Sequence, residues 1–201
     1  MTYTPVRYRS YEEYLYSDFS AEGKYRLLEN GEVVKLPPED ENNVRIAGEL
    51  EYLLKKVIKP RELVRDSATE IQVHPFGDKC VNREPDLLIL QPIHIELMAK
   101  IKKSAILFEM PPPAFVAEIV SPGNPSTDNY RRDYEWKRQQ YEWWQIPEYW
   151  IIDRHRDKVT ALVLEENAYA ETVYISGEYI QSAAFPTLQL AVTQVLAGRE
   201  V

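Results

Sequence analysis

The chain has 201 residues and a formal net charge of −8 at pH 7, with 44% hydrophobic and 28% charged residues. This length suits one sizeable core, so we expect a single domain over residues 1–201. No apolar run approaches the roughly 18 residues that span a bilayer, and residues 1–10 lack the apolar core of a signal peptide. We therefore expect a cytoplasmic protein without a membrane partner. The acidic charge argues against a protein that simply coats a phosphate backbone.

Cysteine and histidine offer no metal cluster in this sequence. Cys80 is the single cysteine, which excludes an internal disulfide and a cysteine zinc site, and we interpret it as a neutral surface thiol. His74, His94 and His155 lack metal-ligand spacing, so surface roles are expected for them. The chain also lacks a P-loop, a dinucleotide-binding fingerprint and a G-x-S-x-G elbow.

The secondary-structure signals are clearest near the N-terminus. Ser10 followed by Glu13 is a capping-box pattern, and Asn30-Gly31 between two β-like runs predicts a hairpin. The expected elements in chain order are a helix over 10–16, strands over 25–29 and 32–36, a helix from 42 or 43 to 57, strands over 63–65, 70–74 and 85–90, a helix over 95–101, a strand over 114–120, a helix over 127–144, strands over 148–153, 158–164 and 169–175, and a helical turn over 193–197.

The order of these elements predicts the fold class. Buried strands lie in the middle of the chain, hairpins lie at both ends, and helices are placed between them. This pattern favours an α/β (α+β mixed) fold, in which helices flank a mixed central β-sheet.

Two carboxylates interrupt the apolar strands. Asp86 precedes the run 87–90, and Glu118 lies inside the run 115–120. A carboxylate in a buried strand is costly unless it is paired or binds a metal, and hard cations such as Mg²⁺ take carboxylate oxygens. The two residues therefore predict a metal site if their strands are neighbours. A structural role is the alternative for each alone, because Asp often caps a turn and Glu often pairs with a basic residue.

The expected helix over 127–144 is the most basic stretch of the chain. Lys137 follows Asp133 by four residues, the spacing of an ordinary surface ion pair on a helix. The aromatic residues of this helix suit base stacking, a dimer interface or the core, and we favour the core for most of them. They are Tyr130, Tyr134, Trp136, Tyr141, Trp143 and Trp144.

Several segments carry a family resemblance. They are YRLLENGE (25–32), LPPE (36–39), EPDL (84–87), VAEIVSP (116–122), and the stretch from Lys137 through Tyr141 to IPEYWIID (146–153). In this order they resemble the Uma-two family of restriction-endonuclease-like proteins, over roughly residues 11–190. The resemblance implies a PD-(D/E)xK nuclease fold with a restriction-endonuclease-like mixed central sheet.

The resemblance also implies a set of site residues. Asp86 and Glu118 are expected to hold Mg²⁺, with Mn²⁺ as a substitute. Val120 stands where this fold usually has its lysine, and Lys137 occupies the place where the family supplies one from the next helix. The family pattern also has an acidic residue near the first hairpin or first long helix. Of the candidates Glu29, Glu39 and Glu49, Glu29 is ranked first because its hairpin matches best. Glu70, on an expected strand before Asp86, is a further candidate.

These residues imply a Mg²⁺-dependent endonuclease that hydrolyses DNA phosphodiester bonds. Two alternatives stay open. The first is a non-catalytic protein-interaction module on a degenerate nuclease fold, favoured by Val120 and the acidic charge. The second is a phosphodiesterase that acts on a small nucleotide. A homodimer is expected, because double-strand cleavage with one site per chain favours two subunits.

Overall fold

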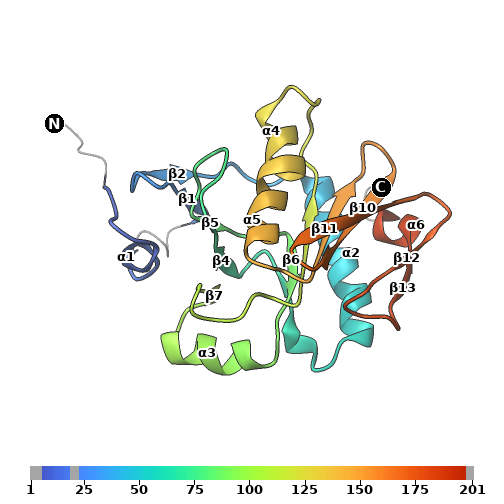
Figure 1. The fold of residues 1–201 in the computed structure, drawn as a ribbon, viewed down its shortest axis with the longest axis horizontal. Coiled ribbons are helices and arrows are strands. Elements are labelled where there is room, and N and C mark those ends of the chain that lie inside the picture. The colour runs from blue at the N-terminus through green and yellow to red at the C-terminus, as the bar shows by residue number, and fades with distance from the viewer. Residues whose placement is uncertain (1–5, 19–22, 198–201) are drawn as a thin grey trace.

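A six-stranded mixed sheet forms the centre of the molecule (Figure 1). The computed structural model describes residues 6–18 and 23–197. The strand order is β11-β10-β9-β8-β6-β3, in which β8 and β9 run parallel and the other neighbours run antiparallel. The strands are β3 (Val64–Asp66), β6 (Leu87–Ile89), β8 (Phe115–Ile119), β9 (Glu148–Asp153), β10 (Lys158–Glu165) and β11 (Ala168–Ile175).

Smaller sheets and short helices surround this centre. The small sheets are the hairpin β1 (Tyr25–Leu27) and β2 (Val33–Lys35), the sheet of β4 (Glu70–Gln72), β5 (Asn82–Arg83) and β7 (Ala105–Ile106), and the hairpin β12 (Tyr179–Gln181) and β13 (Gln189–Ala191). The helices are α1 (Tyr11–Leu15), α2 (Glu41–Val57), a 3-10 turn (Arg61–Leu63), α3 (Ile93–Ile101), α4 (Asp128–Arg131), a π-helical turn (Arg132–Trp136), α5 (Lys137–Trp143) and α6 (Val192–Val195).

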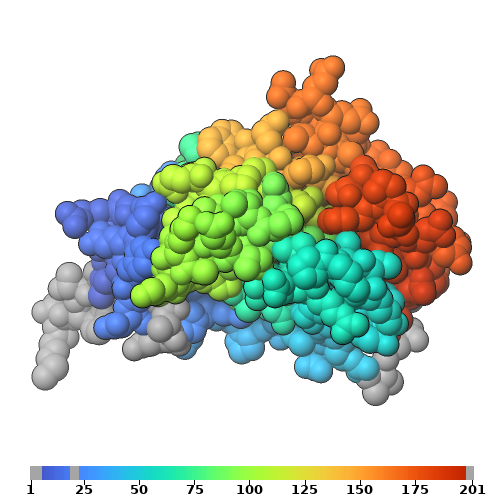
Figure 2. Space-filling model, turned by 90° about the horizontal axis from the view of Figure 1, so that it is seen from below, coloured from blue at the N-terminus to red at the C-terminus, as the bar shows by residue number. Residues whose placement is uncertain are grey.

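Helices cover both faces of the central sheet. Because side chains alternate along a strand, Glu118 and Phe115 of β8 point to opposite faces. Tyr141 of α5 packs on Tyr149 at a ring distance of 4.9 Å, on the face that carries Glu118. Phe115 packs on Trp150 of β9 at 5.0 Å on the other face, where α2 and the C-terminal hairpin lie. Seen from below, α3, the turn after α2 and the C-terminal segment lie side by side (Figure 2).

The structure confirms the expected fold class and most of the expected elements. β9 spans 148–153 as predicted, and the hairpin at Asn30-Gly31 forms. Ser10 caps α1 by accepting from the Glu13 backbone nitrogen at 3.2 Å. The short strands β5, β7, β12 and β13 are absent from the sequence prediction, because two or three residues are too few to show a period. Among the described residues, no helix is long and apolar enough to cross a membrane.

Two helices begin or continue differently from the prediction. α2 is capped by Asp40, not by Asn42 or Asn43, and the Asp40 side chain accepts from the Asn42 backbone nitrogen at 2.9 Å. Asp40 is an equally good cap and gains an ion pair with Arg154 at 3.1 Å. The expected helix over 127–144 is capped by Thr127, one of the two candidates Thr127 and Asp128, but contains the π-helical turn between α4 and α5.

Two side chains expected at the surface are buried. Cys80 is a free thiol in contact with the first hairpin, and its burial raises its pKa to about 11. His94 is fully buried. Hydrogen bonds to both ring nitrogens offset the cost of this burial, one with the Gln91 backbone nitrogen at 3.0 Å and one with the Pro111 carbonyl at 2.8 Å. Both residues are buried by packing against distant segments, which the local sequence does not reveal.

The aromatic residues of the 127–144 segment divide between core and surface. Tyr141 and Trp144 are buried, as expected. Tyr130, Tyr134 and Trp136 are half-buried, and Trp143 is 49% exposed and stacks on His74. The expected core position is therefore confirmed for Tyr141 and Trp144, partly met for the three half-buried residues, and wrong for Trp143.

Candidate active site

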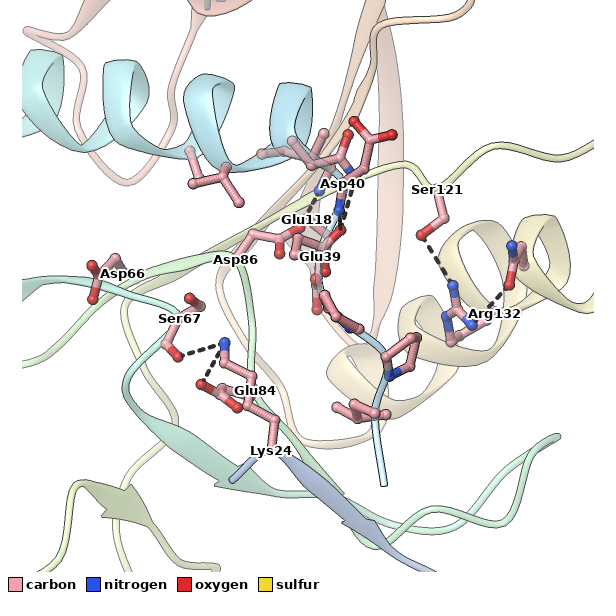
Figure 3. A pocket seen from close by; sticks show the side chains of 18 of the residues that line it. Lys24, Glu39, Asp40, Asp66, Ser67, Glu84, Asp86, Glu118, Ser121 and Arg132 are labelled. Carbon is pink, nitrogen blue, oxygen red and sulfur yellow. Dashed lines mark hydrogen bonds and ion pairs between the residues drawn. The ribbon is translucent and has the colours of Figure 1, made fainter. Parts of the chain in front are cut away.

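A cavity of about 920 Å³ opens between the first hairpin, the N-terminal half of α2 and the start of α4. Figure 3 shows Asp86, Glu118 and Glu39 together at its centre, with Arg132 and Ser121 to one side. The cavity lies where the ends of β6 and β8 meet, so both carboxylates predicted from the sequence reach it.

Asp86 directly precedes β6. The antiparallel pairing of β6 with β8 sets Leu87 opposite Ala117, which brings the Asp86 carboxylate to the Ile119 backbone nitrogen at 2.7 Å. Burial and the nearby charge of Glu118 together raise the pKa of Asp86 to about 8. Burial is the larger cause and the charge of Glu118 the second, so a cation bound beside both carboxylates would favour the ionised form of Asp86.

Glu118 lies on the buried strand β8, and both of its carboxylate oxygens receive a hydrogen bond. The Lys137 ammonium donates to one oxygen at 2.9 Å, and the Tyr141 hydroxyl donates to the other. These donors fix the orientation of the carboxylate toward Asp86 and offset the cost of its burial.

Lys137 begins α5 and lies in the interior. Its ammonium group is 2.9 Å from Glu118 and 2.9 Å from Asp133, and the Asp133 carboxylate also accepts from the Ser121 backbone nitrogen at 3.0 Å. The pair with Asp133 therefore forms at the predicted spacing, but it is buried and not on the surface. Burial alone would lower the pKa of Lys137, yet the charges of Asp133, Glu118 and Asp86 raise it. Lys137 consequently remains a cation at neutral pH.

The structure does not bring Glu29 to this cluster. Glu29 is exposed beside the turn of the first hairpin and forms an ion pair with Lys79 at 3.3 Å. Glu39 is the candidate that lines the cavity, where it accepts from the Asn43 side chain at 3.1 Å and contributes to the raised pKa of Asp86.

The other two acidic candidates lie elsewhere. Glu70 is bound by the Tyr11 hydroxyl and the Asn82 amide, both at 2.9 Å, and Glu49 is absent from the cavity lining.

The two carboxylates Asp86 and Glu118 suit a hard cation that takes most of its other ligands from water or substrate. Within residues 6–18 and 23–197, no three His, Cys, Asp or Glu side chains are grouped closely enough to hold a metal. Mg²⁺ commonly binds one or two carboxylates and completes its shell with water and phosphate oxygens. Asp86 and Glu118 fit that requirement, whereas a structural zinc cage would need four protein ligands.

Sequence reasoning missed three residues that shape the site. Asp133 orients Lys137, Tyr141 orients Glu118, and Arg132 lines the cavity between Ser121 and Asn129. The spacing 133, 137 and 141 is a signal for one helix face. It was not decisive, because the same spacing is common on exposed helices.

The mixed sheet with its flanking helices is a restriction-endonuclease-like fold. Residues 11–193 match the Uma2 family, described as putative restriction endonucleases, and the chain belongs to this family, as the sequence resemblance indicated.

A solved structure supports the fold, while the curated proteins provide no match. The crystal structure of a putative nuclease belonging to DUF820 from Anabaena variabilis ATCC 29413 is similar, with a TM-score of 0.59 and 17% identity over 89% of this chain and 93% of that chain. At this identity the likeness extends to the fold alone.

Proposed function

We propose that this chain is a Mg²⁺-dependent endonuclease that hydrolyses DNA phosphodiester bonds in the cavity around Asp86. The observation that carries the proposal is the cluster of Asp86, Glu118 and a buried, charged Lys137 at the wall of one cavity. Membership of the Uma2 family supports the same conclusion.

Each residue of the cluster has a distinct part in the proposal. Asp86 and Glu118 would hold the ion, which when bound supplies a water of lowered pKa and neutralises phosphate charge. Lys137 carries its charge beside Glu118, where it would stabilise the negative charge that develops on the phosphate. Asp133 and Tyr141 hold Lys137 and Glu118 in place, so little reorganisation is needed when substrate enters.

Plasmid cleavage tests this proposal. We expect Asp86→Asn and Glu118→Gln to lose Mg²⁺-dependent cleavage, because each removes a charge that the ion needs. Glu96→Gln, on the exposed face of α3, is the matched control and keeps wild-type activity. Glu29→Gln is also expected to keep it, because Glu29 lies outside the cavity. Cleavage that persists in both site variants would remove Asp86 and Glu118 from the mechanism.

A non-catalytic role is the second candidate, and one observation favours it. Both oxygens of Glu118 already receive hydrogen bonds, from Lys137 and Tyr141, so the carboxylate is satisfied without a metal. A protein of this kind would bind neither Mg²⁺ nor Mn²⁺.

A small-nucleotide phosphodiesterase is also compatible with the cavity, whose volume of about 920 Å³ would admit a nucleotide. Hydrolysis of bis(p-nitrophenyl) phosphate without plasmid cleavage would favour that activity over an endonuclease.

A further inference from the structure

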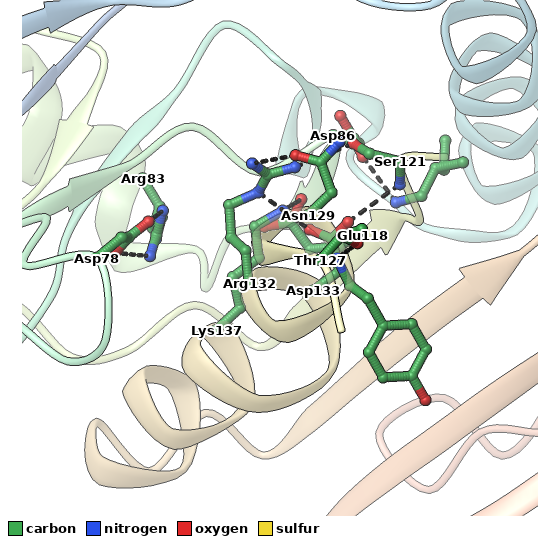
Figure 4. Close-up of polar contacts among 12 residues, drawn as sticks. Asp78, Arg83, Asp86, Glu118, Ser121, Thr127, Asn129, Arg132, Asp133 and Lys137 are labelled. Carbon is green, nitrogen blue, oxygen red and sulfur yellow. Dashed lines mark hydrogen bonds and ion pairs between the residues drawn. The ribbon is translucent and has the colours of Figure 1, made fainter. Parts of the chain in front are cut away.

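Two arginines from different elements line the cavity beside the carboxylate cluster. Arg26 comes from β1, and Arg132 is the first residue of the π-helical turn. Figure 4 shows Arg132 between the Asp78–Arg83 pair and the Asp86–Glu118 pair in this view. Neither arginine has a part in the mechanism proposed above.

Arg132 is held in place mainly by neutral groups. Its guanidinium donates to the Ser121 hydroxyl and the Asn129 side-chain oxygen, each at 3.1 Å. Its Nε is buried, has no hydrogen-bond partner among the described residues, and lies 3.5 Å from Asp133. Asp133 is already bound to Lys137 and to the Ser121 backbone, so the positive charge of Arg132 is only partly neutralised.

Arg26 is similarly short of negative charge. Its ion pair with Asp78 is long, at 3.9 Å, and Asp78 already binds Arg83 through two hydrogen bonds of 2.9 and 2.7 Å. Burial lowers the pKa of Arg26, and the charges of Arg83 and Arg132 lower it further. The two guanidinium groups that line the cavity therefore repel each other, which is the condition that a bound anion would relieve.

We propose that Arg26 and Arg132 bind a substrate phosphate other than the one cleaved at Asp86 and Glu118. Guanidinium groups match phosphate oxygens with paired, charge-assisted hydrogen bonds, and the side chain of Arg132 is fixed before substrate enters. This inference rests on the proposed function and adds to it the substrate group that the cavity recognises. The group is either the next backbone phosphodiester or a terminal phosphate, since both present the same oxygens.

Binding without metal tests this inference separately from catalysis. Fluorescence anisotropy in EDTA would measure the affinity of labelled oligothymidylate, with and without a 5′ phosphate, for wild type, Arg26→Gln and Arg132→Gln. Each variant is expected to bind about tenfold more weakly and with a lower salt dependence, because one phosphate contact is lost. Arg138→Gln is the charge-matched control and is expected to bind as wild type does, because Arg138 is a partly exposed residue of α5 that pairs with Glu171 of β11.

The two phosphate sources give different patterns. A preference for the 5′-phosphorylated oligomer that disappears in both variants identifies a terminal phosphate. An equal loss for both oligomers identifies a backbone phosphodiester.

Thermal unfolding with and without inorganic phosphate shows whether each variant is folded and whether it binds phosphate. Phosphate is expected to raise the Tm of wild type and of Arg138→Gln but not of the cavity variants. Arg132→Lys, which keeps the charge but not the paired geometry, is expected to recover part of the affinity.

The failures of the two proposals are distinguishable. Variants of Arg26 and Arg132 that bind both oligomers as tightly as wild type, or a wild type that binds neither, would overturn the phosphate site. Oligomer binding that depends on both arginines, together with no cleavage under any metal condition, would instead leave the phosphate site standing and overturn the endonuclease.

Discussion

At the scale of single residues, the candidate site is a set of charges that depend on one another. Lys137 lies between Glu118 and Asp133, and all three side chains are buried. Removing one member of such a cluster leaves the others buried without a partner, which costs more than the pair contributed. The cluster therefore links stability to chemistry.

Lys137→Met tests this dependence directly. The substitution keeps an unbranched side chain but leaves Glu118 and Asp133 without their cation, so we expect a loss of about 3 kcal/mol in the free energy of unfolding. Urea unfolding measures it. Lys100→Met, which removes the exposed pair with Glu96 on α3, is the control and should change little. An equal loss of free energy of unfolding in the two variants would contradict the assigned role of the buried cluster in stability.

The raised pKa of Asp86 predicts a pH dependence of the metal-free protein. Folded Asp86 keeps its proton to about pH 8, whereas an unfolded aspartate releases it near its ordinary value of 3.8. Folding therefore binds a proton between these values, and the contribution of Asp86 to stability falls as pH rises through this window.

Urea unfolding in EDTA at about pH 5 and about pH 8 checks the sign. The free energy of unfolding of wild type should fall relative to that of Asp86→Asn at the higher pH. A difference that is constant with pH would contradict the assigned environment of Asp86.

The sequence shows which site residues matter only where they break a pattern. Asp86 and Glu118 stand out because each interrupts an apolar strand. Lys137 and Asp133 look like a surface pair, because helix spacing does not report burial. Glu29 matched a local motif, but the direction in which a hairpin turn points is set by tertiary packing, and here it points to Lys79.

At the scale of elements, the π-helical turn is the feature that assembles the site. It places one wider turn over Arg132–Trp136, between α4 and α5. Such turns are often found at functional sites, and this one carries Arg132 and Asp133 and ends where Lys137 begins. The sequence predicted the helix, but a π turn has no hydrophobic period of its own and was not predicted.

Gly77 packs closely against Trp136, the last residue of the π-helical turn. Its φ of +41° is unfavourable for other residues, and an added Cβ would lie 2.3 Å from the Trp136 ring. We expect Gly77→Ala to destabilise the protein by about 2 kcal/mol, since both the backbone and the ring must shift.

Gly48 on α2 provides the matched control in urea unfolding. An added Cβ meets nothing within 4 Å there, so Gly48→Ala should stabilise the protein by about 0.5–1 kcal/mol. Gly77→Ala with wild-type stability would mean that Trp136 does not pack on this turn.

At the scale of the whole molecule, the cavity exists because small sheets pack against the central one. Val81 donates to the Leu27 carbonyl at 2.9 Å, which holds the first hairpin against the strand that leads to Asp86. Asn82 reinforces this contact by accepting from the Leu27 backbone nitrogen at 2.7 Å. The central strands were predictable from apolar runs. The contacts between the small sheets join residues far apart in sequence, so they were not predictable.

The homodimer expected from the sequence stays a prediction, and β11 is the surface that suits it. This strand is an edge of the central sheet and carries Val173 and Ile175, which are 44% and 56% exposed. Edge strands with apolar side chains favour pairing with another strand. We expect light scattering after gel filtration to give a dimer for wild type and a monomer for Ile175→Lys. A monomeric wild type would contradict it.

Metal binding by Asp86 is the central requirement of the proposed endonuclease. Calorimetric titration with Mn²⁺ should give saturable binding to wild type and to Glu96→Gln, and no binding to Asp86→Ala. That result would establish the metal site on which the endonuclease proposal depends. Equal binding by wild type and Asp86→Ala, or none by either, would contradict it.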